Sequence, residues 1–251
     1  MAGHSKWANI KHKKAKTDAL KGKIFAKLAR EIFVAARAGG GDPDHNFRLK
    51  VAIDNAKAAN VPNDNIQRAI QKATGGGEDV NYEELRYEGY GLGGVAIMVD
   101  ILTDNRNRTA SEMRHLFSKN GGNLGETGSV SWMFTEKGQF TILKESLEIQ
   151  EDDLILLALE AGAEDIEEQD EFYQILTEPG NFERVRQALF DNQIAIKNAA
   201  VSLIPTNNME ISDLEQAKKV INLIESLENH DDVQRVYTNF DLADSLSEED
   251  L

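Results

Sequence analysis

Residues 137–205 read KGQFTILKESLEIQEDDLILLALEAGAEDIEEQDEFYQILTEPGNFERVRQALFDNQIAIKNAAVSLIP, and this stretch decides the fold. Alternating apolar and polar residues favour strands, whereas apolar residues spaced three and four apart favour helices. These patterns predict strands at residues 139–143, 164–168, 172–177 and 194–204, and helices at residues 152–161 and 180–191. A strand–helix–strand–strand–helix–strand order is the ferredoxin-like arrangement. We therefore expect residues 137–205 to form a complete ferredoxin-like domain.

The segments on either side of this domain are each incomplete. Upstream, the pattern predicts strands at residues 82–88, 95–102 and 129–134, a helix at 104–120 and a turn at 136–138. Downstream, it predicts only a helix at 212–227 and a strand at 233–238. Because the downstream pair completes the upstream set, we predict one discontinuous α+β domain of residues 78–136 and 206–240, with residues 137–205 inserted in it. Residues 241–251 are an acidic tail.

The N-terminal part of the chain has a helical pattern. Helices are predicted at residues 18–38, 42–59 and 64–73, separated by glycine-rich or proline-containing breaks. Residues 1–16 lack helical periodicity and are expected to be an extended arm, or one that becomes ordered on binding. Residues 1–77 would thus contain a basic arm and a three-helix domain. The predicted fold class is α+β multidomain.

Charge is distributed very unevenly along the chain. Residues 1–72 hold 15 Lys and Arg against 6 Asp and Glu, whereas the other residues hold 13 basic and 37 acidic side chains. Clustered Lys and Arg bind nucleic acids because they release the counterions condensed on phosphates. The asymmetry therefore indicates a nucleic-acid partner for the N-terminal part. The simplest alternative is a solvated, disordered basic leader.

The first predicted helix argues against that alternative. At about 100° per residue, Lys23, Lys27, Arg30 and Arg37 fall on one stripe narrower than a quarter-turn. The apolar side chains fall on a separate arc made of Leu20, Ile24, Phe25, Leu28, Ile32 and Ala35. Part of the basic cluster is therefore mounted on an amphipathic helix.

The candidate nucleic-acid contacts lie mostly in this basic segment. Those expected to bind phosphates are Lys6, Lys11, Lys13, Lys14, Lys16, Lys23, Lys27, Arg30 and Arg37. His4, His12 and Trp7 are expected to fit the arm to its target, with the indole either stacking on a base or anchoring the arm to the helical domain. Arg106 and Arg108 are a candidate secondary anion site, or they make ion pairs between domains. The glycine-rich stretch 120–129 either approaches a nucleic-acid backbone or is only a helix end and loop.

Other motifs do not indicate an enzyme. Residues 89–94, GYGLGG, match a dinucleotide-binding pattern, but they lie between two predicted strands, so a hairpin turn is expected. The five histidines are not spaced as metal ligands. The chain has no cysteine, and its longest apolar runs are far shorter than the roughly 20 residues of a membrane span. We predict a cytoplasmic protein that is not an enzyme, with no cofactor, no metal, no small-molecule substrate and no membrane partner.

Several unusual strings in the chain carry a family resemblance. They are Ala2-Gly3-His4-Ser5-Lys6-Trp7, Ile10, Lys11, Asp18, residues 21–25, Asn46, Pro62, Arg68-Ala69-Ile70, Tyr87-Glu88-Gly89-Tyr90-Gly91, residues 103–109, Gly121-Gly122-Asn123-Leu124-Gly125 and Gly128-Ser129-Val130. In these strings the chain resembles the YebC/PmpR family of probable transcriptional regulatory proteins, whose mitochondrial relatives are translational activators of cytochrome oxidase subunit I. One departure is Leu92, where the family usually has proline. The resemblance implies a helical domain and two α+β domains, the third ferredoxin-like and inserted in the second.

Taken together, these features favour a nucleic-acid-binding regulator of gene expression, most simply a DNA-binding transcriptional regulator. The resemblance implies promoter DNA for some members and the ribosome for others. A ribosome-associated translation factor that binds ribosomal RNA is therefore one alternative. A protein-interaction module that binds no nucleic acid is another. The sequence contains no recognisable helix-turn-helix, zinc finger or aromatic platform for single strands, so phosphate contacts are better supported than base readout.

Overall fold

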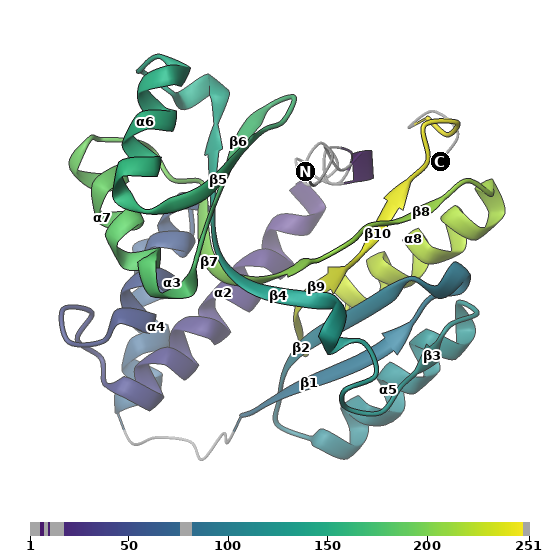
Figure 1. Ribbon diagram of the computed structural model, residues 1–251. Helices are drawn as coiled ribbons and strands as arrows, with labels where there is room; N and C mark the ends of the chain where they lie inside the picture. Colours follow the sequence, from purple (N-terminus) through teal and green to yellow (C-terminus); the bar gives the residue numbers. More distant parts are fainter. Residues whose placement is uncertain (1–5, 8–9, 11–17, 76–81, 248–251) are drawn as a thin grey trace. The chain divides into compact units, whose positions relative to one another are not determined.

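The computed structural model describes residues 6–7, 10, 18–75 and 82–247, and the chain divides into two compact units. Unit 1 comprises Met1–Thr17, Val80–Thr135 and Leu203–Leu251, and unit 2 comprises Asp18–Asp79 and Glu136–Ser202. Figure 1 labels the elements of both units. The predicted fold class is confirmed: three helices precede two α+β parts, and the ferredoxin-like part is inserted in the other. The residue limits given above for the domains stay a prediction.

Three helices form the first part of unit 2: α2 (Asp18–Gly39), α3 (Phe47–Ala58) and α4 (Asn63–Thr74). Their apolar sides meet in a core that includes the fully buried Ile32 and Leu49 and the nearly buried Ile66. Burying side chains of this size contributes about 1.5–3 kcal/mol each. Ile24, which lies on the apolar arc of the helix, does not join this core and is 37% exposed.

Asn46, and not Asp42, caps the N-terminus of α3. Its Oδ1 accepts a hydrogen bond from the backbone N–H of Leu49, and its Nδ2 donates to the carbonyls of Ala35 and Gly40. The helix begins at Phe47, so the predicted start at residue 42 is five residues too early. Asp42 instead closes a turn, in which its carboxylate lies 2.7 Å from Nδ1 of His45.

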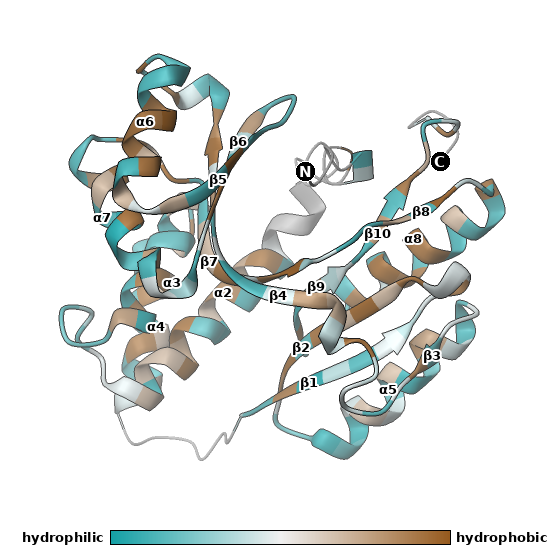
Figure 2. Cartoon of the chain, viewed as in Figure 1, coloured by the Kyte–Doolittle hydropathy of each residue, from teal (hydrophilic) through white to brown (hydrophobic). Residues whose placement is uncertain are grey.

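The second part of unit 2 is a four-stranded sheet in the order β5-β6-β4-β7. Its strands are β4 (Phe134–Leu143), β5 (Ala163–Glu168), β6 (Phe172–Thr177) and β7 (Asn198–Pro205). The helices α6 (Glu151–Ala161) and α7 (Phe182–Asp191) pack against this sheet around a core that includes Phe140, Leu154 and Leu189. Much of α6 is hydrophobic, as its brown colour in Figure 2 shows. This strand order confirms the ferredoxin-like arrangement.

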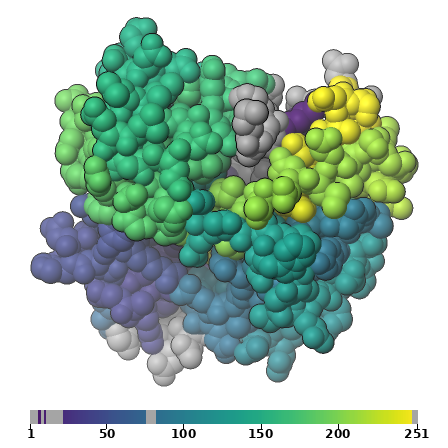
Figure 3. All heavy atoms as spheres, viewed as in Figure 1, coloured from purple at the N-terminus to yellow at the C-terminus, as the bar shows by residue number. Residues whose placement is uncertain are grey.

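Unit 1 has its own four-stranded sheet, in the order β3-β1-β2-β9. Its strands are β1 (Glu83–Tyr90), β2 (Ala96–Thr103), β3 (Asn123–Leu124) and β9 (Val233–Thr238), and its helices are α5 (Arg106–Lys119) and α8 (Leu214–Glu228). The central strand β2 is buried on both faces: Ile97 and Val99 point into the core that includes helix residues, and Met98 packs with Val130. In the space-filling view, the yellow-green C-terminal residues lie directly against the teal residues of the sheet and α5 (Figure 3).

Two predictions near the start of β4 are wrong. Residues 131–133 form a short 3-10 helix rather than the end of a strand, and β4 runs without a break through the turn predicted at 136–138. Gly138 pairs with Thr177 inside the sheet. A Cβ atom at Gly138 would lie 2.6 Å from Thr177 Cγ2, so glycine is needed there for close packing.

Two short strands near the C-terminus were not predicted. The strands β8 (Met209–Ile211) and β10 (Phe240–Leu242) pair in parallel. Residues 194–197 lie outside any strand, so the strand predicted from residue 194 begins four residues later. The hairpin predicted at residues 89–94 is confirmed, because β1 and β2 pair antiparallel, although Gly89 and Tyr90 still belong to β1.

Candidate nucleic-acid interface

The basic stripe of α2 lies opposite the side of the helix that packs. Ile32, Ala35 and Ala36 are almost completely buried against α3 and α4. Projected down the helix axis, the stripe of Lys23, Lys27, Arg30 and Arg37 is centred about half a turn away from them. Lys23 and Arg37 are exposed, and Lys27 and Arg30 are partly exposed. Four cationic groups therefore share the outward side of this helix.

Lys6, Trp7 and Ile10 have helical backbone, so the extended arm predicted for residues 1–16 is wrong at these positions. Trp7 and Ile10 are buried in the core of unit 1, at 5% and 4% exposure. The indole packs edge-on against Phe240, with ring centroids 5.5 Å apart. Lys6 Nζ donates a 3.4 Å hydrogen bond to the backbone carbonyl of Asp244.

This burial bears on the two roles considered for Trp7. A ring with 5% exposure offers little surface on which a base could stack. The geometry instead suits the anchoring role, although the anchor lies on the α+β unit and not on the helical domain. The other predicted contacts in the arm fall outside the described residues; they are His4, Lys11, His12, Lys13, Lys14 and Lys16.

Arg108 is already paired with carboxylates of its own unit. Its guanidinium donates to Asp232 at 2.7 Å and to Asp104 at 3.1 Å. The pairs lie within unit 1, so they are not the interdomain pairs considered above. Arg106, two residues earlier, is exposed and is the better placed of the two for an external anion.

Asp232 is the centre of this network. Its buried Oδ2 also accepts hydrogen bonds from the hydroxyls of Thr109 at 2.8 Å and Thr103 at 3.1 Å. Burial opposes ionisation of the carboxyl group, but the bonds from Arg108 and the two threonines outweigh burial and hold the pKa of Asp232 below its ordinary value. The network ties the start of α5 to the residue that precedes β9.

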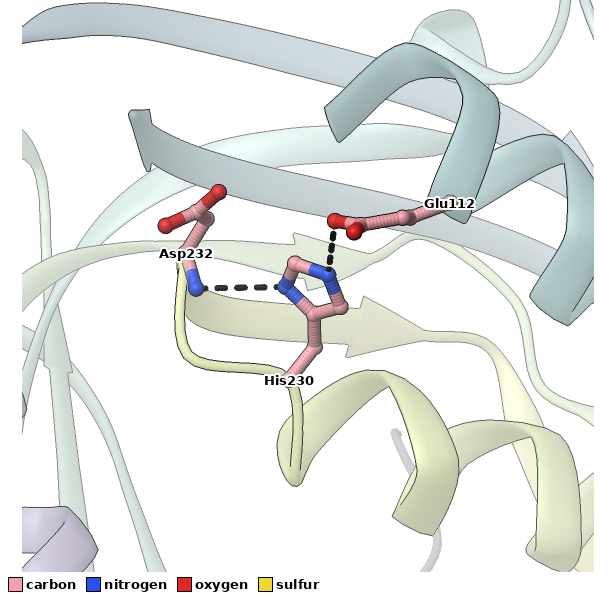
Figure 4. A group of neighbouring side chains, drawn as sticks. All are labelled: Glu112, His230 and Asp232. Atoms are coloured by element: carbon pink, nitrogen blue, oxygen red, sulfur yellow. Dashed lines mark hydrogen bonds and ion pairs between the residues drawn. The ribbon is translucent and has the colours of Figure 1, made fainter. Parts of the chain in front are cut away.

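His230 lies beside Asp232, which raises the question of a metal site. Glu112, His230 and Asp232 each offer one ligand atom, and these atoms lie within 4.8 Å of one another (Figure 4). Sequence spacing did not indicate this grouping because Glu112 and His230 are 118 positions apart.

The hydrogen bonds of the group speak against a metal. His230 Nδ1 accepts from the backbone N–H of Asp232 at 3.1 Å, so the ring proton of the neutral tautomer sits on Nε2, 2.8 Å from Glu112 Oε2. Both ring nitrogens are therefore in use (Figure 4). The positive charge next to Asp232 is supplied by the Arg108 guanidinium. The group fits a polar junction between α5 and the end of α8 better than it fits a metal site.

The glycine-rich stretch 120–129 is held by a buried carboxylate that sequence reasoning missed. Glu88, on β1, accepts hydrogen bonds of 2.8–2.9 Å from the backbone N–H groups of Gly128, Val130 and Ser131. Burial opposes its ionisation, but these three bonds outweigh burial and lower the pKa of Glu88. Next to this loop, Trp132 is 71% exposed. The signal in the sequence was an aromatic residue three positions after this glycine-rich stretch.

Comparison with known proteins covers both parts of the chain. Residues 5–76 match the family described as TACO1/YebC protein N-terminal domain, and residues 82–240 match TACO1/YebC second and third domain. A "Probable transcriptional regulatory protein" of Desulfitobacterium hafniense is 69% identical over 251 residues, which is 100% of both chains. One of the same name from Natranaerobius thermophilus is 57% identical over 99% of each chain. The crystal structure of a conserved hypothetical protein from Aquifex aeolicus, 48% identical, matches with a TM-score of 0.87 and covers 96% of this chain and 98% of its own.

Proposed function

Because this chain belongs to the TACO1/YebC family, we propose that it regulates gene expression by binding DNA, with its basic N-terminal segment and α2 contacting phosphates. The relatives described above are named probable transcriptional regulatory proteins, a name for a regulator and not for an enzyme. Among the described residues, no helix is both long enough and apolar enough to cross a membrane. The cytoplasmic location expected from the sequence stays a prediction.

The observation that carries this proposal is the basic stripe on α2. The helix packs through Ile32, Ala35 and Ala36, and the cations are centred about half a turn away from these buried residues. Cations spaced along one helix side suit a row of phosphates, because each contact releases condensed counterions. The positive charge is concentrated in the first 72 residues, which carry 15 of the 28 Lys and Arg.

The acidic remainder of the chain supports the same orientation. Residues beyond 72 hold 37 of the 43 Asp and Glu. A surface with that excess of negative charge repels a polyanion, so it steers the basic segment toward DNA and keeps the other faces away. The proposed contacts bind phosphates and carry no sequence information by themselves.

The test is a salt titration of a fluorescently labelled DNA duplex. We compare the wild type with a stripe variant, Lys23→Gln, Lys27→Gln, Arg30→Gln and Arg37→Gln. A matched control replaces four exposed lysines elsewhere, Lys72, Lys119, Lys197 and Lys219, with glutamine. Each phosphate contact adds about −0.9 to the slope of log affinity against log salt, so the stripe variant is expected to lose about 3–4 from that slope. The control variant is expected to keep most of the salt slope of the wild type.

The same titration separates the alternatives. Equal salt slopes for the wild type and the stripe variant would contradict the proposed interface. Much tighter binding to ribosomal RNA or ribosomal particles than to DNA would favour a translation factor. A third outcome is that the chain binds neither DNA nor RNA but binds a protein with an affinity that does not change with salt. That outcome would favour the protein-interaction module.

A further inference from the structure

The helix α6 is apolar on every side. Its residues 154–159 read LILLAL, so apolar side chains point away from the core as well as into it. Leu154 and Ala158 are fully buried, whereas Leu156 is 58% exposed and Leu159 is 48% exposed. A helix that is apolar all round is normally buried all round. Within unit 2, α6 packs chiefly on α7 and β5, and its outward side leaves two leucines in water.

The two exposed leucines lie between carboxylates. At about 100° per residue, Leu156 projects about half a turn away from the centre of the buried side, and Leu159 lies about 60° from Leu156. Asp152, Asp153 and Glu160 project on the same outward half of the helix, and all three are exposed. We call these five residues the α6 surface.

The negative charge of the α6 surface is not explained by the helix alone. Acids in the first turn interact favourably with the helix dipole, which accounts for the two aspartates. Glu160 lies in the last turn, where a negative charge opposes that dipole. In the described part of this domain, the ion pairs of Lys137, Lys144 and Arg186 are made with other carboxylates. The α6 surface therefore presents both its leucines and its charge to the outside.

This combination restricts what covers the surface. Residues 137–205 hold 15 Asp and Glu against 5 Lys and Arg, so this domain repels a nucleic acid. A second copy that docked through the same surface would bring like charges together. A basic amphipathic helix satisfies both requirements, because its apolar side covers leucines and its Lys or Arg side chains pair with carboxylates.

We propose that the α6 surface docks a basic amphipathic helix of a partner protein. Apolar side chains spaced three and four apart on that helix cover Leu156 and Leu159, and cations at its edges pair with the surrounding carboxylates. The interaction goes beyond the proposed function and is independent of it, since it uses no residue of the basic stripe on α2.

The probe is a fluorescently labelled synthetic peptide of about 18 residues, with leucines spaced three and four apart on one side and lysines elsewhere. Two comparison peptides replace either all lysines with glutamate or all leucines with serine. Fluorescence anisotropy measures the affinity of each peptide for the full-length protein. We expect the wild type to bind the first peptide more tightly than either comparison peptide, with an affinity that falls as salt rises.

Variants locate the binding to α6. Replacing both leucines, Leu156→Ser with Leu159→Ser, should weaken binding of the first peptide by about tenfold or more. Glu160→Gln removes a charge that opposes the helix dipole, so the fold is kept, and it should weaken binding by about twofold to fivefold. The matched control is Phe190→Ser on α7, since Phe190 is 68% exposed in the same domain. The control and the α2 stripe variant should both bind the peptide as the wild type does.

Three results would overturn the proposal. They are equal affinity of the leucine variant and the wild type for the first peptide, equally tight binding of the glutamate peptide, and no binding of the first peptide to the wild type. Sedimentation tests the other occupant: a wild-type dimer that the leucine variant dissociates would mean that a second copy covers the surface, which also contradicts the proposal. None of these results changes the salt slope for DNA, so the proposed function is judged separately.

Discussion

The backbone N–H of Trp7 donates a 3.1 Å hydrogen bond to the carboxylate of Asp241, joining two residues that are 234 positions apart. The other contacts of Asp241 support this link, since its Oδ1 also accepts from the N–H of Leu242 and the residue is only 7% exposed. The basic N-terminal segment therefore starts from a fixed point on unit 1. All the residues proposed to bind phosphates except Lys6 follow Trp7 in the sequence.

Replacing Trp7 tests whether its ring has a structural role. Trp7→Ala removes the contact with Phe240 and leaves a cavity, so we expect the free energy of unfolding of unit 1 to fall by about 3–5 kcal/mol. Trp7→Leu refills part of that space and is expected to cost less. Urea unfolding followed by Trp132 fluorescence measures both. DNA affinity of the folded Trp7→Leu protein should match the wild type, and a large loss there would show that the ring contacts nucleic acid.

The Glu88 carboxylate is expected to stabilise unit 1 only while it is ionised. Glu88→Gln loses the charge that three backbone N–H groups bond, so we predict a cost of about 2–3 kcal/mol in urea unfolding at pH 7. Glu126→Gln, at an exposed position of the same loop, is the control and should change stability by less than about 0.5 kcal/mol.

The pH dependence of Glu88→Gln follows from the lowered pKa. The pKa of Glu88 in the folded protein lies below its ordinary value, so its stabilisation is complete above the ordinary pKa and is lost as the pH falls through the lower, folded pKa. Between pH 7 and the acid range, the wild type should therefore lose more stability than Glu88→Gln. Parallel pH profiles for the two proteins would contradict this account of the loop.

The pairing of Arg108 predicts that it contributes little to DNA binding. Its charge is matched by Asp232, so Arg108→Gln should change DNA affinity by less than about twofold, while leaving a buried carboxylate unpaired and costing about 1–3 kcal/mol of stability. Arg106→Gln is the comparison, because Arg106 is exposed on the same helix. If a secondary anion site exists at the start of α5, the Arg106 variant is the one that should weaken binding.

Asn55 joins the three helices to the ferredoxin-like sheet within unit 2. Its side chain accepts from the N–H of Ala199 at 3.0 Å and donates to the carbonyl of the same residue at 2.8 Å. Asn55→Ala leaves both buried groups without a partner, so we expect a cost of about 2–4 kcal/mol and faster hydrogen exchange of the Ala199 amide. The exposed Asn63→Ala is the control. Unchanged exchange at Ala199 in Asn55→Ala would refute this role for the amide.

The regular elements of the fold could be predicted because their periodicity is strong and local. The strand at residues 233–238 and the ferredoxin-like order emerged from pattern alone. The start of α3 could not be predicted from the pattern, because Asp42 and Asn46 are both good N-cap residues. The choice between them depends on hydrogen bonds from Asn46 to the carbonyls of Ala35 and Gly40. Strands of three residues, such as β8 and β10, are too short to show a period.

In the candidate site, too, local features could be predicted from the sequence and features that depend on distant residues could not. The stripe on α2 is a property of one helix, so residue spacing was sufficient to locate it. The burial of Trp7 depends on Phe240, and the pairing of Arg108 depends on Asp232, and both partners lie more than 120 positions away. Gly138 shows the converse problem: it was read as a turn residue, but its lack of a side chain serves close packing against Thr177 and Phe182.

The central claim is that the cations on the outward side of α2 bind the phosphates of DNA. The most direct measurement is the DNA dissociation constant of the stripe variant and of the four-lysine control between about 50 and 200 mM salt, the range over which phosphate contacts dominate the change. We predict that the stripe variant binds more weakly at every salt concentration and with a shallower salt slope, while the control stays close to the wild type. A stripe variant that is folded and indistinguishable from the control in both quantities would contradict the account.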